Sequence, residues 1–211
     1  MVIYRVLSII VIVASLYWLF SFLKKNEFSI GKVVNSFWDN FKNSVGKLKG
    51  IKSNSLQTNL NLFKRFFYLT TLFLFLLMAV SAFIPVLLGN TLSDIFLLVH
   101  VTVAPLFSIF IAILIILFAH SNRLTKDDVM ENSEEQKIKF NQKGYLKVIF
   151  WLVALFSVSA MISIVLNMFP IFGTEGQVYL LDVHKYSTLL LLLLVIFHSG
   201  LLTVNSKQNL K

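Results

Sequence analysis

The sequence predicts an all-α integral membrane protein, a bundle with five transmembrane helices. Hydrophobic residues make up 57% of the 211 residues and the mean hydropathy is +0.79, values too high for an ordinary soluble domain. Five apolar stretches are long enough to cross a hydrocarbon core of roughly 30 Å as helices. Most charged residues lie in the connections between these stretches.

The first apolar stretch, residues 1–23, is expected to be an N-terminal membrane anchor. A cleavable signal peptide has a shorter apolar core and small residues before the cleavage site. Here apolar residues continue to Leu23 and include the bulky Trp18 and Phe20. We therefore expect an uncleaved helix.

The next segment, residues 24–65, is polar and basic, with nine Lys and Arg against Glu27 and Asp39. Apolar residues recur at spacings of three and four, and lysines occupy the other faces, which is typical of an amphipathic helix. One interpretation is a helix at the membrane interface, attracted to anionic lipid. The other is a docking surface for a partner subunit.

The other four spans are expected within residues 66–204, as a four-helix membrane domain. The short link between about Leu88 and Ile95 makes the second and third spans antiparallel neighbours, and Pro105 is expected to kink the third. The fourth span has small side chains that allow close helix approach, namely Ser157, Ser159, Ala160 and Ser163.

The remaining segments are expected to be connections. Residues 121–147 have no apolar periodicity and are expected to form a solvated loop, and residues 170–182 a structured outer loop at most. Residues 205–211 form a short polar tail.

The distribution of cations predicts the orientation. Of the 19 Lys and Arg, 17 lie in 24–65, 120–147 and 205–211, which fall on one side of a five-span arrangement. By the positive-inside rule, these segments are cytoplasmic and the N-terminus is outside, as in a bacterial-type inner membrane. The net charge of +9 therefore encodes topology, and we expect no nucleic-acid partner.

The four histidines are the candidate functional residues. His184 and His198 are fourteen residues apart in the last span, within about 40° of one helix face and about 21 Å apart along the axis. His100 lies one turn inside the third span and His120 just past its other end. The predicted topology makes His100 and His184 an outer pair, and His120 and His198 an inner pair.

Two histidines per level suit haem better than other metals. Zinc or copper needs three or four ligands at one depth, whereas haem needs two axial ligands, and the absence of cysteine excludes covalent attachment through C-x-x-C-H. Two alternatives remain open: the histidines form hydrogen bonds between helices, or His120 only ends its helix. Candidate cations for haem propionates are Lys185 outside and Lys64, Arg65 and Arg123 inside. Small residues near the histidines could either admit a macrocycle or be ordinary packing residues, namely Ala104, Ser108 and Gly200.

About residues 62–204 resemble the membrane cytochrome b subunits of formate dehydrogenases, nickel–iron hydrogenases and thiosulfate reductases. In that family the final core helix carries two haem ligands fourteen residues apart, matched by His184 and His198, and the second core helix carries another near its start, matched by His100. The family's fourth ligand lies where this chain reads Lys64-Arg65-Phe66-Phe67-Tyr68. His120 is the only substitute, rotated by about 200° from His100 on a straight helix.

The resemblance implies b-type haem, quinone chemistry and a catalytic partner subunit. We expect one or two haems per chain, quinone as the substrate, and a partner redox subunit that is either a cytochrome c or an iron–sulfur or catalytic subunit. With no catalytic dyad or phosphate loop in the sequence, any enzymatic activity is expected to be quinone oxidoreduction within a complex. We expect an electron-transfer subunit that connects a quinone pool to a partner protein. The alternative function is a cofactor-free membrane anchor or assembly subunit.

Overall fold

A computed structural model describes residues 2–26, 28, 30–49, 56–132 and 137–208. The chain forms two compact units. The first consists of Met1–Ala14 and Phe20–Phe118, and the second of Ser15–Leu19 and Ala119–Lys211.

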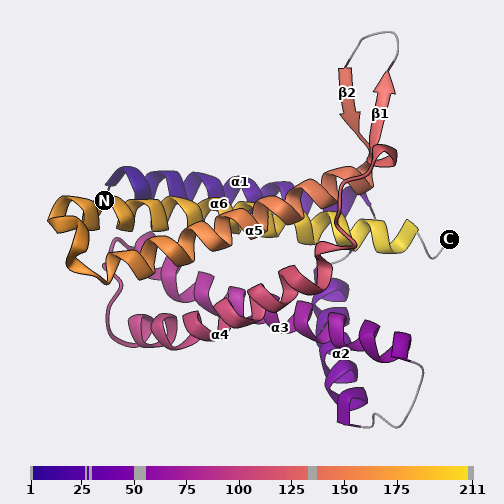
Figure 1. The fold of residues 1–211 in the computed structure, drawn as a ribbon, viewed down its shortest axis with the longest axis horizontal. Helices are drawn as coiled ribbons and strands as arrows, with labels where there is room; N and C mark the ends of the chain where they lie inside the picture. The colour runs from indigo at the N-terminus through magenta and orange to yellow at the C-terminus, as the bar shows by residue number, and fades with distance from the viewer. Residues whose placement is uncertain (1, 27, 29, 50–55, 133–136, 209–211) are drawn as a thin grey trace. The chain divides into compact units, whose positions relative to one another are not determined.

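The predicted five-span, all-α class is confirmed, and the protein is a multi-pass membrane protein. Five helices are long and apolar enough to cross a membrane. Helices suit this environment because they satisfy their backbone hydrogen bonds internally where lipid offers no partners. Many large apolar side chains on these helices are exposed and available to lipid. The helices are α1 (Val2–Lys25), α3 (Leu56–Leu88), α4 (Asp94–Ala119), α5 (Gln142–Asn167) and α6 (Gly173–Gln208) (Figure 1).

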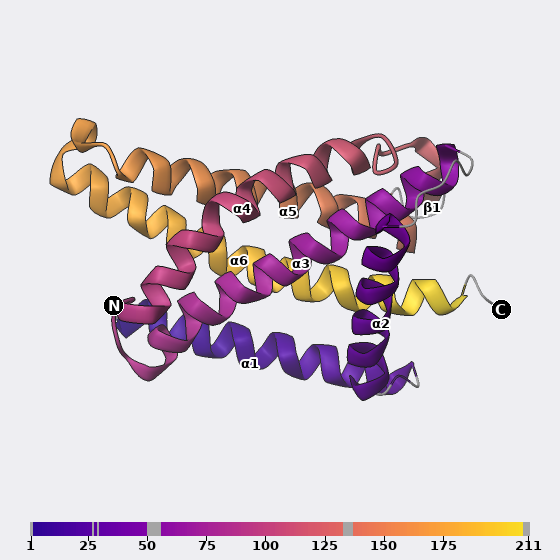
Figure 2. The same ribbon diagram turned by 90° about the horizontal axis from the view of Figure 1, so that it is seen from below.

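In the first unit, α3 and α4 face each other through aromatic side chains. Ring centroids lie 6.0 Å apart for Phe75 and Phe107, and 5.2 Å apart for Phe67 and Phe110. Pro105 lies within α4, which changes direction in its first half (Figure 2). This unit also contains α2 (Ile30–Lys49), which forms the predicted amphipathic helix.

The turn after α3 is closed by a glycine and an arginine. Gly89 has a φ of +82°, and the amide of Asn90 donates to the carbonyl of Pro85 in the bond pattern typical of a glycine-terminated helix. Arg5 Nη2 donates to the carbonyl of Leu87 at 2.9 Å. Arg5 thereby satisfies one of the carbonyl groups that the end of α3 leaves without an intrahelical partner.

In the second unit, α5 and α6 form an antiparallel hairpin. The small residues predicted to permit close approach are largely buried, with exposed fractions of 1% for Ser157, 6% for Ala160 and 3% for Ser163. The hydroxyl of Ser157 donates to its own helix at the carbonyl of Val153, so its burial leaves no unsatisfied donor.

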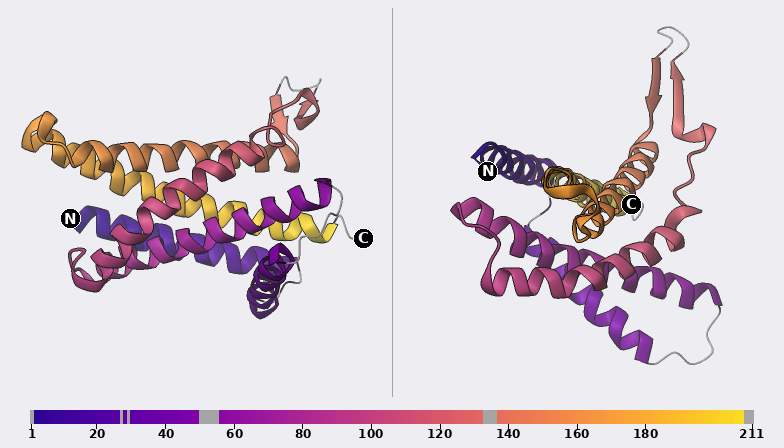
Figure 3. Two further views of the ribbon diagram at one scale, coloured as in Figure 1. Left: turned by 60° about the horizontal axis from the view of Figure 1, so that its bottom comes forward. Right: turned by 60° about the vertical axis from the view of Figure 1, so that its left-hand side comes forward.

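The connection before α5 differs from the expected loop. It contains the 3₁₀ helix η1 (Lys126–Asp128) and an antiparallel hairpin of β1 (Val129–Asn132) and β2 (Lys137–Phe140). The hairpin extends away from the start of α5 (Figure 3). Asn141 caps α5 by accepting from the amide of Gly144 at 2.7 Å, and it also donates to the carbonyl of Asp127.

The helices α3 and α6 begin earlier than expected. The first begins at Leu56, not at residue 66, and the second at Gly173, so the expected outer loop 170–182 is mostly helical. Only η2 (Pro170–Phe172) and its flanking residues connect α5 to α6. The polar residues within 170–182 suggested a loop, but most of them lie on α6, which extends beyond its apolar stretch.

Candidate functional site

His184 lies within α6, eleven residues from its start and not at the helix end as expected. Its Nδ1 is 2.9 Å from the carbonyl oxygen of Ala160 on α5. A carbonyl only accepts, so Nδ1 carries the proton and the neutral ring keeps its lone pair on Nε2. This is the tautomer in which a histidine ligates a metal through Nε2, with a backbone carbonyl orienting the ring.

His100, in the first unit, also has a hydrogen-bond partner at Nδ1. Its Nδ1 is 3.2 Å from the hydroxyl of Ser81 on α3, and this hydroxyl lies 3.0 Å from the carbonyl of Met78. A hydroxyl can both donate and accept, so this contact fixes the position of the ring and not which of its nitrogens carries the proton.

Each of these two histidines is held at a similar depth within its own unit. Ser81 lies seven residues before the end of α3 at Leu88, and Ala160 lies seven residues before the end of α5 at Asn167. At 1.5 Å per residue, each hydrogen bond is about 10 Å from the end of the partner helix.

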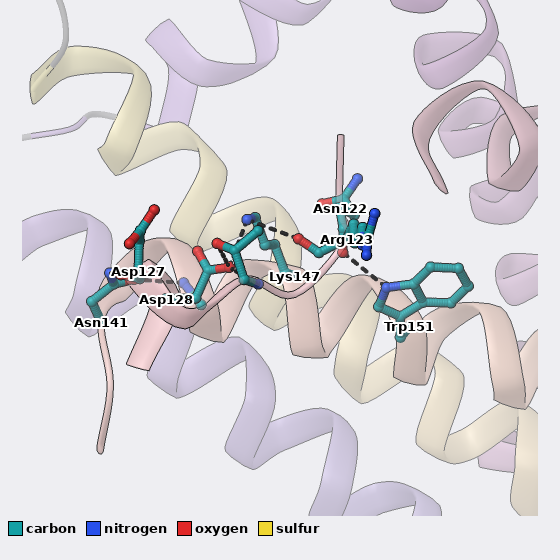
Figure 4. A network of polar contacts seen from close by, with 9 residues as sticks. Asn122, Arg123, Asp127, Asp128, Asn141, Lys147 and Trp151 are labelled. Atoms are coloured by element: carbon teal, nitrogen blue, oxygen red, sulfur yellow. Dashed lines mark hydrogen bonds and ion pairs between the residues drawn. The ribbon is translucent and has the colours of Figure 1, made fainter. Parts of the chain in front are cut away.

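His120 follows the last residue of α4, Ala119, as expected from the sequence. It is exposed, and its carbonyl accepts from the amide of Arg123 at 3.4 Å. The next residues are bound to α5: Trp151 Nε1 donates to the carbonyl of Asn122 at 2.9 Å, and Lys147 Nζ to that of Arg123 at 3.0 Å (Figure 4). These contacts hold the segment after His120 beside the first turns of α5.

The register of α5 and α6 places His198 at this same level. Two hydrogen bonds between the antiparallel helices define the register: His184 is bonded to Ala160, and Gln177 is bonded to Asn167. Each step along α6 therefore corresponds to an equal step backwards along α5. His198 is fourteen residues after His184, so it lies level with residue 146, which is fourteen residues before Ala160 and within the first two turns of α5. His120 and His198 therefore lie at similar depths in the second unit.

His198 differs from His100 and His184 in the hydrogen bonding of its Nδ1. Its Nδ1 is buried and has no hydrogen-bond partner among the residues that the structure describes. A buried polar atom without a partner is costly, so such an atom is a candidate for contact with a bound group. Three of the four histidines belong to the second unit, and His100 belongs to the first.

The polar network at the base of α5 includes a buried carboxylate. Asp128 is only 4% exposed and accepts from Lys147 Nζ at 2.7 Å, from the amide of Thr125 at 2.7 Å and from its hydroxyl at 2.8 Å (Figure 4). The hydrogen bond from Lys147, followed by those from Thr125, lowers the pKa of Asp128 from 3.8 to about 2. The ionised carboxylate therefore stabilises this connection.

Acid is expected to loosen this network. Because the pKa of Asp128 is lower in the folded protein than in an unfolded chain, its stabilisation is complete above pH 3.8 and is lost as the pH falls to about 2. Amide hydrogen exchange in the segment 122–128, corrected for intrinsic rates, should accelerate over this interval. Asp128→Asn should make exchange fast already at neutral pH, whereas the exposed Asp127→Asn should not. Unchanged protection through the acid interval would contradict the assignment.

Two of the cations considered for propionates already have partners. Lys185 Nζ donates to Asp182 at 3.1 Å, and Lys64 Nζ lies 5.7 Å from the ring centroid of Phe118. Arg65 and Arg123 are exposed. The latter contributes its backbone carbonyl to the polar network at the base of α5.

The space expected beside Gly200 is filled by α1. A Cβ at this position would lie 3.0 Å from Leu19 and 3.2 Å from Trp18, whose ring packs against Phe197 at 4.3 Å between centroids. Gly200 therefore permits close approach of two helices, which agrees with the second of its two expected roles, ordinary packing.

Sequence reasoning missed the groups that orient the histidines. The carbonyl of Ala160 has no signature in a sequence, since every residue carries one. Ser81 left a weak signal, as a hydroxyl within an apolar span. The ion pair between Asp128 and Lys147 was also missed, because nineteen residues separate the partners and the sequence between them was expected to form a loop.

Comparison with protein families, curated proteins and solved structures finds no match for this chain. Within the described ranges, no three or more histidine or acidic side chains gather as a metal-ligand cluster. Axial ligation by two imidazoles does not require such a cluster.

Proposed function

We propose that this protein is a membrane cytochrome b subunit that passes electrons between a quinone and a partner redox protein through bis-histidine haem b. The observation that carries the proposal is that His100 and His184 are each hydrogen-bonded through Nδ1 to a neighbouring helix of their own unit, and that the carbonyl of Ala160 leaves the lone pair of His184 on Nε2. The quinone and the partner subunit follow from the family resemblance.

The residues fit the ligand set that haem b requires. Haem supplies a one-electron redox couple when bound. The carbonyl of Ala160 orients the imidazole of His184 and increases the basicity of its Nε2, as acceptor partners of ligating histidines generally do, and the hydroxyl of Ser81 positions the ring of His100. We assign His100 and His184 to one haem, and His198 with His120 to a second.

The same hydrogen bonds would also serve a cofactor-free anchor subunit, in which the histidines only connect helices. A pyridine haemochrome assay on the purified protein separates the two functions. The proposal requires b-type haem at one or two per chain. Protein that remains without haem, after expression in a host with sufficient haem supply, would establish the anchor function instead.

We further propose that the protein lies in a bacterial-type inner membrane with its N-terminus outside and its C-terminus in the cytoplasm. The distribution of Lys and Arg supports this orientation. The two cations assigned to the outer side have local partners: Arg5 binds the carbonyl of Leu87, and Lys185 pairs with Asp182. Both charges are thus partly compensated.

Reporter fusions test this topology. A reporter fused after Lys211 should be active on the cytoplasmic side, because the positive-inside rule retains the basic connections there. A second reporter should be inserted between α5 and α6 at residues 168–172, since helix α6 begins at Gly173, and should report from outside. A cytoplasmic signal from this second site would reverse the orientation.

A further inference from the structure

The amphipathic helix α2 crosses the direction of its neighbours. Figure 2 shows α2 running across α1 and α3 near the ends of these helices that carry Lys24, Lys25 and Lys64. Because α3 is a membrane-spanning helix, its axis approximates the membrane normal. A helix that crosses α3 steeply at this end is oriented along the membrane plane.

The position of Trp38 indicates how deep α2 lies. Its ring is 6.4 Å from that of Phe73 on α3 and 6.3 Å from that of Phe41 on α2, between centroids. Phe73 is eight residues beyond Arg65, or about 12 Å along α3 from the charged end. An in-plane helix with its apolar face in the acyl boundary brings its aromatic side chains beside the apolar part of the spans. The contact with Phe73 places the ring of Trp38 beside the apolar part of α3, beyond the charged end.

The faces of α2 match this position. Phe41 and Val45 are partly buried and Ser44 is 2% exposed, whereas Lys42 and Asn43 are exposed. Helical spacing places three of the four lysines of α2, namely Lys32, Lys42 and Lys47, more than 90° from Phe41 around the helix, and the helix contains a single acidic residue. Basic residues on the exposed half of an in-plane helix face the lipid phosphates.

We propose that α2 is an in-plane binding surface for anionic phospholipid, in the leaflet on the side of Lys64 and Arg65. The lysines on its polar half bind the headgroup phosphates, and the ring of Trp38 packs beside the acyl chains. The proposal is independent of the haems, because it concerns a helix that carries no histidine.

The test uses the full-length protein in nanodiscs. Spin-labelled phosphatidylglycerol and phosphatidylcholine are compared in the boundary layer, which gives the preference for the anionic lipid. In a variant with Lys32, Lys42 and Lys47 replaced by Gln, this preference should fall about fivefold or more, because each cation near the surface attracts anionic lipid with about 1 kcal/mol. The corresponding Lys→Arg variant, which keeps the charge, should retain the preference.

A matched control removes equal charge from the other large basic connection of the chain, with Lys126, Lys137 and Lys139 replaced by Gln. This variant should keep most of the preference. An unchanged preference in the α2 variant, or an equal loss in the control, would overturn the proposal. A variant with Trp38 as its single tryptophan gives a second readout: bromine-labelled acyl chains should quench its fluorescence, and quenching only by a water-soluble quencher would place α2 outside the membrane.

Discussion

Replacing His184 with alanine is expected to remove one low-spin b-type haem per chain. The variant loses an axial ligand and leaves the iron five-coordinate, and His100→Ala should have the same effect on the same haem. Haem stoichiometry from the pyridine haemochrome and the low-spin EPR signals measure the loss. The other haem should remain in both variants.

Two further variants separate ligation from structural support. In His184→Gln the side-chain amide still donates to the carbonyl of Ala160, so the helix contact survives while the preferred iron ligand is lost. Ser81→Ala removes the hydroxyl that positions the ring of His100 and should reduce haem affinity about 10–100-fold without changing the spin state. Full haem content in both His100→Ala and His184→Ala would rule out the proposed ligand set.

His198→Ala is expected to have the second large effect, loss of the other haem with retention of the one assigned to His100 and His184. Its Nδ1 is buried without a partner in the described part of the chain, so this side chain contributes little to helix contacts through hydrogen bonding. The thermal stability of the haem-free variant should therefore change less than that of haem-free His184→Ala, which also loses the bond to Ala160. The same stoichiometry and EPR measurements distinguish the two haems.

His120→Ala decides whether the second haem has two histidine ligands. Because His120 lies at the depth of His198, its replacement should convert the second haem from low spin to high spin or remove it. An unchanged spectrum would mean that His120 only ends α4, and a chain with two haems would then need another ligand. The exposed position of His120 makes its replacement a mild structural change, so loss of haem is readily attributed to ligation.

The presence of the membrane helices could be predicted from the sequence better than the residues at which they begin and end. Long apolar runs predict membrane helices reliably, because lipid leaves the backbone no other way to satisfy its hydrogen bonds. Their ends were less predictable: α6 begins at Gly173 although Glu175 and Asp182 interrupt the apolar pattern. A helix that extends past the hydrocarbon core tolerates polar residues, so hydropathy marks the membrane boundary and not the helix end.

The sequence by itself determined the five spans, the fourteen-residue separation of His184 and His198, and the position of the basic helix α2. These follow from composition and from helical periodicity, which are properties of local sequence. Only the tertiary structure decided that Ala160 and Ser81 orient two histidines, that Trp18 and Leu19 fill the space at Gly200, and that Asp128 pairs with Lys147. Each of these contacts joins residues nineteen or more positions apart, so it depends on how separate segments pack together. The sequence does not reveal such contacts, because many residues of an apolar span are nearly interchangeable as packing partners.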